Sequence, residues 1–287
     1  MALTVVEQAE GFDLRLGADT VGRYVSRPQT AGLESPRPYL HPLLTAGGIA
    51  ITDFRPEDHR WHHGLSLAVP TVNGSNLWGG GSWDRAAGGY LEKGDNGSQR
   101  TDDATVNPLG DGLSSRVTWL GADGGVLAVE ERSLTVAEVG TGGGWTLDWS
   151  SRVRASTPLR LGSPAAHGRT GAGYGGLFLR AAPAFRGARA RTDRASSRAA
   201  DELLGATARW LALTRSDGAA TVVLGTRHDA TWFVRSEEYP GFGPAPFFAR
   251  EVALGPGEEL ELAVRLFAVD GEPDDDEIDR VLAASGP

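Results

Sequence analysis

Cysteine is absent from the 287 residues of the chain, which excludes disulfides, thiolate metal sites and cysteine nucleophiles. Lysine is almost absent too, because Lys93 is the single lysine among 28 basic residues. No stretch of 18 apolar residues occurs, so no transmembrane helix is expected. Residues 1–10 lack the basic and apolar regions of a signal peptide. A cytoplasmic location is therefore expected.

The charge balance is acidic, with a formal net charge of −9. Proteins that bind nucleic acids carry a basic patch or stripe. The short arginine-rich segment at residues 186–191 is followed by mixed charges, which is typical of a solvated loop. We therefore expect neither a nucleic acid nor a membrane as a partner.

Glycine, in contrast, is abundant: 40 of 287 residues are glycine, about 14 % against a usual 7 %. This excess indicates many turns. Apolar residues alternate with polar ones at residues 12–16, 145–153 and 260–266, which predicts strands, and turn sequences at 121–125 and 216–218 predict hairpins. A helical pattern occurs at 274–284, and residues 195–204 could form a further turn or two. The predicted fold is all-β: one domain over residues 1–287, a large antiparallel two-sheet β-sandwich with a short C-terminal helix.

Two long stretches without strand alternation, around residues 26–38 and 73–112, are expected to be loops that form a site. Four of the six histidines lie between positions 41 and 63, most densely in Glu57-Asp-His-Arg-Trp-His-His-Gly64. If this segment is extended, His59 and His63 project to one face about 13 Å apart. A metal bound to both would then require a bend in the segment.

Neutral imidazole can transfer protons near neutral pH or bind a divalent metal. The candidate catalytic residues are His59, His63, His167, His228 and Glu237, with Glu238 as the alternative carboxylate. The same four histidines are the candidate metal ligands. Aromatic faces can stack on sugar rings, and Arg and Asn can bind pairs of hydroxyls. The candidate substrate-binding residues are His41, Arg60, His62, Asn73, Trp78, Arg169, Tyr174, Trp232 and Arg235.

Five motifs in order resemble a bacterial family of unknown function whose members often carry the name "methane oxygenase PmoA". They are Pro38-Tyr-Leu-His-Pro-Leu43, Asp58-His-Arg-Trp-His-His-Gly-Leu65, Val72-Asn-Gly74 with Leu77-Trp78, Tyr174-Gly-Gly-Leu-Phe178 and Trp232-Phe-Val-Arg235. The name does not suit this chain, because a membrane methane oxygenase subunit needs transmembrane helices. The family tends to occur beside sugar dehydrogenases of the Gfo/Idh/MocA type, so the resemblance implies a role in sugar catabolism. Where relatives have Glu-Gly-Arg, this chain has His167-Gly-Arg169.

A weaker resemblance is to galactose mutarotase-like proteins, which are large β-sandwiches with catalytic histidines and a glutamate on a concave sheet. This resemblance implies a supersandwich fold for the chain. It does not by itself imply the mutarotase reaction, since one fold carries many functions.

Three functions remain open. The favoured one is an enzyme that uses histidine acid/base chemistry on a sugar or keto-sugar, of the epimerase or lyase type. The alternatives are a divalent-metal-dependent hydrolase or lyase with a multi-histidine site, and a non-catalytic carbohydrate-binding accessory protein. A small-molecule carbohydrate is the expected partner, no organic cofactor is expected, and a homo-oligomer is left open.

Overall fold

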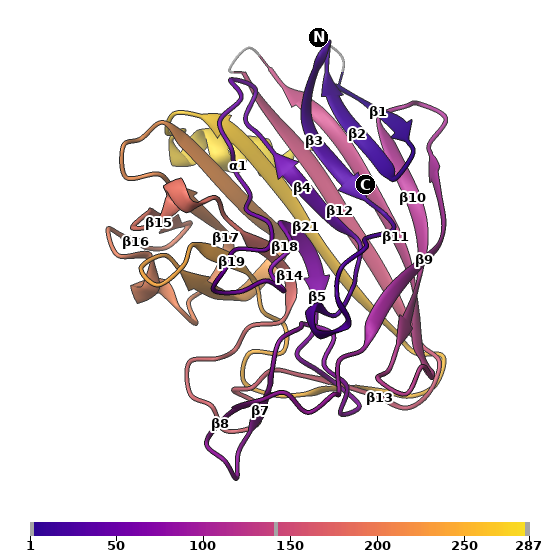
Figure 1. Ribbon diagram of the computed structural model, residues 1–287. Helices are drawn as coiled ribbons and strands as arrows, with labels where there is room; N and C mark the ends of the chain where they lie inside the picture. The colour runs from indigo at the N-terminus through magenta and orange to yellow at the C-terminus, as the bar shows by residue number, and fades with distance from the viewer. Residues whose placement is uncertain (1–2, 141–142, 285–287) are drawn as a thin grey trace.

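The computed structural model describes residues 3–140 and 143–284. Their regular structure is dominated by antiparallel strands, which form a network of 16 strands in two layers (Figure 1). The first layer contains, in spatial order, β1 (Leu3–Gln8), β2 (Gly11–Leu16), β3 (Asp19–Val25), β4 (Tyr39–Leu43), β5 (Leu65–Ala68), β14 (Gly176–Arg180) and β19 (Gly241–Pro244). The second contains β9 (Ser98–Val106), β10 (Gly112–Leu120), β11 (Val126–Val139), β12 (Gly144–Ala155) and β21 (Glu259–Asp270), followed by β17 (Thr207–Thr214), β15 (Arg189–Thr192) and β16 (Ser196–Ser197).

Strand β18 (Ala220–Arg235) joins the two layers. Its first part, residues 220–225, pairs with β21, whereas residues 232–235 pair with β19 in the other layer. The neighbouring β17 carries a register shift between Ala208 and Trp210, and such bulges bend a strand. The predicted antiparallel β-sandwich is therefore confirmed, with one long bent strand shared by both sheets.

The alternation that predicted strands corresponds to burial in the structure. On β12, Trp145 and Trp149 are buried in the core, while Ser150 and Arg152 between the buried positions are exposed. The predicted hairpins are also confirmed: residues 121–125 connect β10 to β11, and residues 216–218 connect β17 to β18.

The predicted C-terminal helix is confirmed as α1 (Asp275–Ala283). Asp274 caps it, because its carboxylate accepts a hydrogen bond of 2.7 Å from the backbone N–H of Glu277. Ile278 and Val281, one turn apart, are buried. Short 3-10 helices complete the helical structure of the described residues, at Gly32–Glu34, Pro183–Phe185 and Ala200–Leu203. No helix in this part of the chain is long and apolar enough to cross a membrane.

The expected long loop at residues 73–112 is only partly a loop. It contains β9 and the two-stranded hairpin of β7 (Ser82–Asp84) and β8 (Gly89–Leu91). Strand β9 pairs with β10 alone, at the edge of its sheet. Polar side chains are tolerated along such an edge, so its sequence lacks the apolar alternation that would have predicted it. The stretch around residues 26–38 is a loop apart from its 3-10 helix.

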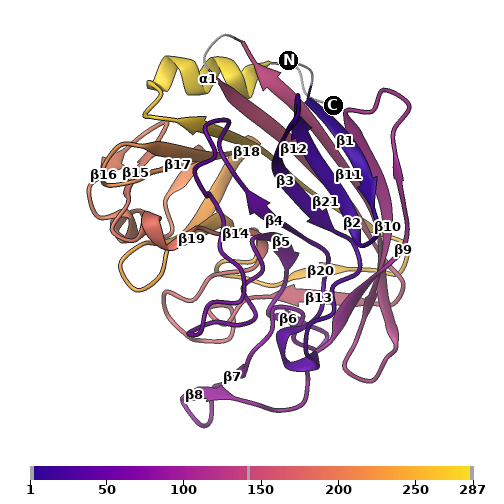
Figure 2. The same ribbon diagram turned by 45° about the horizontal axis from the view of Figure 1, so that its top comes forward.

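Hairpin β7–β8 lies at one end of the sandwich, the lower end in Figures 1 and 2. A small sheet lies at the same end, built from β6 (Thr71–Val72), β13 (Leu159–Gly162) and β20 (Val252–Leu254). The loops that precede β5, β7 and β14 hold most of the histidine and tryptophan motifs. This arrangement brings motifs that are distant in sequence into one region.

A buried ion pair on β11 is hydrogen-bonded to the opposite layer. The side chains of Glu130 and Arg132, both on β11, are fully buried, and Arg132 Nε donates to Glu130 Oε1 over 2.7 Å. Arg132 Nη1 also donates to the hydroxyl of Tyr24 on β3 of the opposite layer (3.1 Å). Trp119 Nε1 donates to Glu130 Oε2 over 2.9 Å. Both charges are thus hydrogen-bonded from several sides, as buried charges must be.

Candidate functional site

The histidine-rich segment is not extended. The backbone N–H of His59 donates to the carbonyl of Pro56 (3.0 Å), and that of His62 donates to the carbonyl of His59 (2.9 Å), so the chain turns twice in seven residues. These turns place the rings of His59 and His62 in a stack with centroids 4.6 Å apart. His63 points elsewhere, into the protein. The extended arrangement with His59 and His63 on one face is therefore wrong.

The stacked pair lines a cavity of about 320 Å³, which we call the first cavity. Aromatic rings form much of its wall, and two arginines and a carboxylate add charge. Six of the residues predicted from sequence line it: His59, His62, Trp78, Arg169, Tyr174 and Arg235. The further lining side chains that matter here are Trp61, Tyr90, Phe233, Glu238 and Tyr239.

Asp58 and His59 form a hydrogen-bonded dyad at this cavity. His59 Nδ1 lies 2.7 Å from Asp58 Oδ2. Partial burial would raise the pKa of Asp58, but the hydrogen bond to His59 and the charge of Arg180 outweigh it and lower that pKa. Asp58 is therefore a carboxylate that can accept the Nδ1–H of His59, so Nε2 is the nitrogen of that ring available to accept a proton.

His62 is held in the opposite tautomer. Arg180 Nη1 lies 3.2 Å from His62 Nδ1, and a guanidinium can only donate, so Nδ1 accepts and Nε2 carries the proton. Burial, together with repulsion from His59 and Arg180, keeps the pKa of His62 well below its usual value. His62 is thus a neutral hydrogen-bond donor beside His59, a potential proton acceptor.

Glycines support the aromatic wall of the first cavity. Gly80 has a left-handed backbone (φ 67°), and a Cβ there would lie 2.7 Å from the indole of Trp61. Gly79 is similarly close to Trp61. The indole can therefore lie directly on this backbone only because both residues lack side chains. Across the cavity the rings of Trp78 and Tyr174 pack with centroids 4.6 Å apart.

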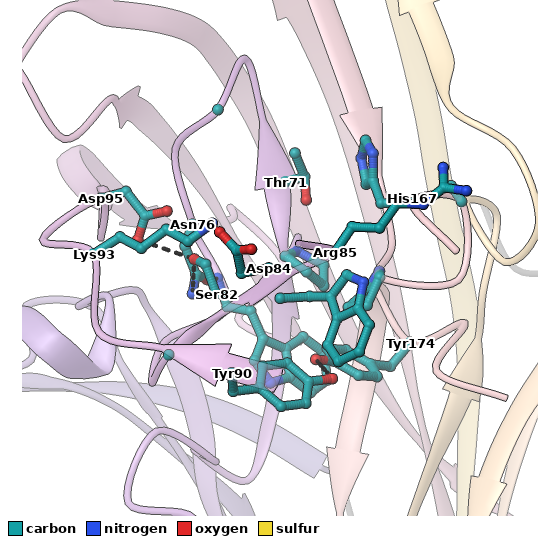
Figure 3. A pocket seen from close by; sticks show the side chains of 17 residues that line it. Thr71, Asn76, Ser82, Asp84, Arg85, Tyr90, Lys93, Asp95, His167 and Tyr174 are labelled. Atoms are coloured by element: carbon teal, nitrogen blue, oxygen red, sulfur yellow. Dashed lines mark hydrogen bonds and ion pairs between the residues drawn. The ribbon is translucent and has the colours of Figure 1, made fainter. Parts of the chain in front are cut away.

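His167 lies in an adjoining cavity of about 390 Å³, which we call the second cavity (Figure 3). Its Nε2 is 3.4 Å from Glu251 Oε1. Lys93 and Asp84 form an ion pair of 2.9 Å in the same cavity. His167 is therefore near the stacked histidines but is not part of their cavity.

Two predicted histidines have internal hydrogen-bond partners. His63 is buried, and its Nε2 lies 3.1 Å from Glu34 Oε2, the carboxylate that also pairs with Arg55. His41 Nδ1 lies 3.0 Å from the hydroxyl of Thr52, and burial lowers the pKa of His41. Neither lines the first or the second cavity. These contacts fit a structural use of both side chains.

Five other predicted residues also lie outside the two cavities. Trp232 is fully buried, and Asn73 links two loops by hydrogen bonds to Pro158 and Arg160. His228 is exposed and lines a wide cavity of about 970 Å³ beside β18. The remaining two, Arg60 and Glu237, are exposed.

Several site residues were missed because only the fold brings them in. Arg180, at the end of β14, orients Asp58 and His62. Tyr239 contacts the rings of both His59 and His62. Glu238 was not missed, since it was the alternative to Glu237 as the carboxylate, and of these two neighbours Glu238 lines the cavity. Asp58 could have been found from the sequence, because it directly precedes His59 and an adjacent carboxylate can orient a histidine ring.

The four histidines considered as metal ligands occupy four different environments, as described above. Among the described residues, no three His, Asp or Glu side chains are grouped so that they could hold a metal ion. These histidines therefore do not form one multi-histidine centre.

Lowering the pH from 7 to 5 is expected to destabilise the fold through His63. Burial and the charge of Arg37 lower the pKa of His63 from 6.5 to about 2, so below pH 6.5 the unfolded state binds the extra proton. The free energy of unfolding then falls by about 1.4 kcal/mol per pH unit for this residue. Urea unfolding at pH 7, 6 and 5 should give a shallower pH dependence for His63→Gln than for the wild type. Equal pH dependence of the free energy of unfolding in the two proteins would contradict the lowered pKa of His63.

Fold and site together define a β-sandwich protein with an aromatic cavity lined by His59, which is hydrogen-bonded to Asp58, and by the neutral His62. Residues 11–283 match a family of unknown function (DUF6807), and the chain belongs to this family. A search among curated proteins found no significant match.

Solved structures similar to this chain include several carbohydrate enzymes. A heparan sulfate lyase HepC mutant from Pedobacter heparinus is 8 % identical with a TM-score of 0.45, over 96 % of this chain and 37 % of that one. The GH36 α-galactosidase AgaA from Geobacillus stearothermophilus is 10 % identical with a TM-score of 0.39, over 94 % and 40 %. A galactose mutarotase related enzyme from Lactobacillus acidophilus is 9 % identical with a TM-score of 0.37, over 95 % and 98 %. The chain thus spans about two fifths of the lyase and the α-galactosidase.

Proposed function

We propose that this protein is an enzyme that moves a proton on a sugar or keto-sugar, with His59 as the base. The observation that carries the proposal is the pair of stacked imidazoles in opposite tautomers on one cavity wall. Paired groups whose surroundings assign them different protonation roles are typical of acid/base sites. The aromatic wall offers surfaces for the C–H face of a sugar ring.

The proposed step begins with a sugar carbonyl in the first cavity. His59 Nε2 takes the proton from the carbon next to the carbonyl, and the electron pair moves onto the carbonyl oxygen to give an enolate. His62 Nε2–H donates a hydrogen bond to that oxygen. Return of this proton from the His59 imidazolium restores the sugar, whereas proton delivery from water to the opposite face gives the epimer. In elimination, the enolate electrons form a carbon–carbon double bond, the leaving oxygen takes the electron pair of its C–O bond, and the His59 imidazolium protonates it. Asp58 stabilises the imidazolium that His59 becomes.

Exchange in D₂O tests this step whichever product forms. A panel of aldoses, ketoses and oxidised sugars is incubated with the protein, and ¹H NMR follows the C–H signal next to the carbonyl. We expect the protein to accelerate the loss of this signal for at least one sugar. Binding detected by calorimetry with no exchange, epimerisation or elimination would favour a carbohydrate-binding accessory protein instead. Loss of activity on dialysis against EDTA, restored by Mn²⁺ or Zn²⁺, would favour a metal-dependent enzyme.

A further inference from the structure

The first and second cavities share a wall. Trp78, Gly81, Tyr90 and Tyr174 line both of them. Their volumes of about 320 and 390 Å³ each reach the lower end of the range for small-molecule sites. The two cavities are therefore adjacent, and each has room for one small unit of a ligand.

The second cavity has polar groups of its own, and they differ from those of the first. Lys93 and Asp84 lie on one side of it and His167 on the other (Figure 3). Asp95 on the same side as Lys93 accepts a hydrogen bond from Ser82 (2.9 Å). These charged and hydroxyl groups can exchange their mutual hydrogen bonds for those of a sugar's hydroxyls. The second cavity is lined by one histidine, His167, and not by a stacked pair. We therefore assign this cavity a role in binding and not in proton abstraction.

Two tyrosines mark the boundary between the cavities. The hydroxyls of Tyr90, on β8, and Tyr174, before β14, are 2.8 Å apart. Burial raises the pKa of both, so both are protonated at neutral pH. In such a pair one hydroxyl donates its hydrogen to the other. The accepting hydroxyl keeps its own hydrogen, which it can donate to a further acceptor. An oxygen that bridges two sugar rings would be such an acceptor.

Arg169 supports the same boundary from the side of the first cavity. Its guanidinium lies 4.6 Å from the ring centre of Tyr90 and 5.6 Å from that of Trp83, within the range of cation–π contacts. Tyr90 and Trp83 belong to hairpin β7–β8, so this contact fixes the hairpin between the two cavities. The division into two compartments is thus built from packed side chains.

We propose that the two cavities form one site for a two-ring carbohydrate, a disaccharide or a glycoside, with the bridging oxygen at the Tyr90–Tyr174 pair. The reacting ring lies in the first cavity beside His59 and His62, and the second ring lies in the cavity of Lys93 and His167. This inference rests on the proposed function for the choice of a sugar as ligand. The two-compartment binding does not depend on the proton transfer.

Calorimetric titration with paired probes tests the proposal. The probes are cellobiose, maltose and lactose. Each is compared with a single-ring partner, the methyl glycoside of one of its two sugars. We expect at least one disaccharide to bind ten-fold or more tightly than its single-ring partner. Ala166, which lines only the second of the two cavities, is changed to Trp to fill that space. This variant should bind the disaccharide as weakly as the single ring and leave single-ring affinity unchanged.

Ala249→Trp is the matched control, since Ala249 is exposed and lines a different cavity. It should retain the preference for the disaccharide. Equal affinities for both probe types, a preference that survives in Ala166→Trp, or no binding of any probe would each overturn the proposal. A disaccharide preference that Ala166→Trp removes, in a protein that exchanges no C–H proton, would uphold the two-ring site and refute the proposed chemistry.

Discussion

Replacement of His59 by asparagine is expected to lower kcat for proton exchange by about 10²–10⁴-fold, the usual contribution of a positioned general base. Asparagine keeps polarity near Asp58 but has no nitrogen that can accept a proton. Because the tryptophan and tyrosine side chains of the cavity wall are unchanged, the affinity for the sugar should change little. Exchange rates from ¹H NMR in D₂O and calorimetric titration separate these two effects.

His228→Asn is the matched control for this experiment. His228 is exposed on β18 and lines neither of the two adjoining cavities, so the change should leave kcat and affinity at wild-type values. Asp58→Asn should lower kcat in the same direction as His59→Asn, because an uncharged amide no longer stabilises the imidazolium. An unchanged kcat in His59→Asn, or a similar loss in His228→Asn, would refute the role of His59 as the base.

Replacement of Arg132 by methionine is expected to lower the free energy of unfolding by about 3–5 kcal/mol. Glu130 would remain fully buried, with hydrogen bonds from neutral donors such as Trp119 but without its counter-charge. The hydrogen bond from Arg132 to Tyr24 in the opposite layer would be lost as well. Urea unfolding followed by tryptophan fluorescence measures the change.

Arg116→Met provides the comparison on the adjacent strand. Arg116 pairs with Glu131, but both side chains are more than half exposed (55 % and 61 %), and exposed pairs contribute about 0–1 kcal/mol. The double variant Glu130→Leu/Arg132→Met should recover part of the stability, since it removes both buried charges. A loss in Arg132→Met no larger than in Arg116→Met would show that the buried pair does not stabilise the two layers.

Much of the architecture could be predicted from local patterns. The alternation around Trp145 and Trp149 marks a strand with one buried face whatever its partners are, and turn glycines mark the hairpins. The helix was predictable from the acidic cap at Asp274 and the spacing of Ile278 and Val281. Strand β9 was not, because an edge strand with polar side chains has no local signature distinct from a loop.

The candidate site, like the fold, could be predicted from the sequence only in part. Residue types alone indicated a polar ligand and identified His59, His62, Trp78, Arg169, Tyr174 and Arg235, all of which line the first cavity. They assigned catalysis to His63 and substrate binding to His62, although His62 lines the cavity and His63 bonds to Glu34 in the interior. The turn at His59–His62 causes this difference, and it rests on backbone hydrogen bonds that no side-chain pattern specifies.

By itself, the sequence determined the class of fold and the chemical character of the site, because side-chain polarity and turn preferences act over a few residues. The tautomers of His59 and His62, in contrast, follow from their different neighbours in the folded chain. Asp58, the sequence neighbour of His59, orients one ring, whereas Arg180, more than a hundred residues from His62, orients the other and is brought there only by the tertiary structure. The division of the site into two cavities likewise depends on the meeting of Tyr90 and Tyr174 from separate segments. Such long-range contacts arise only when the sheets pack together.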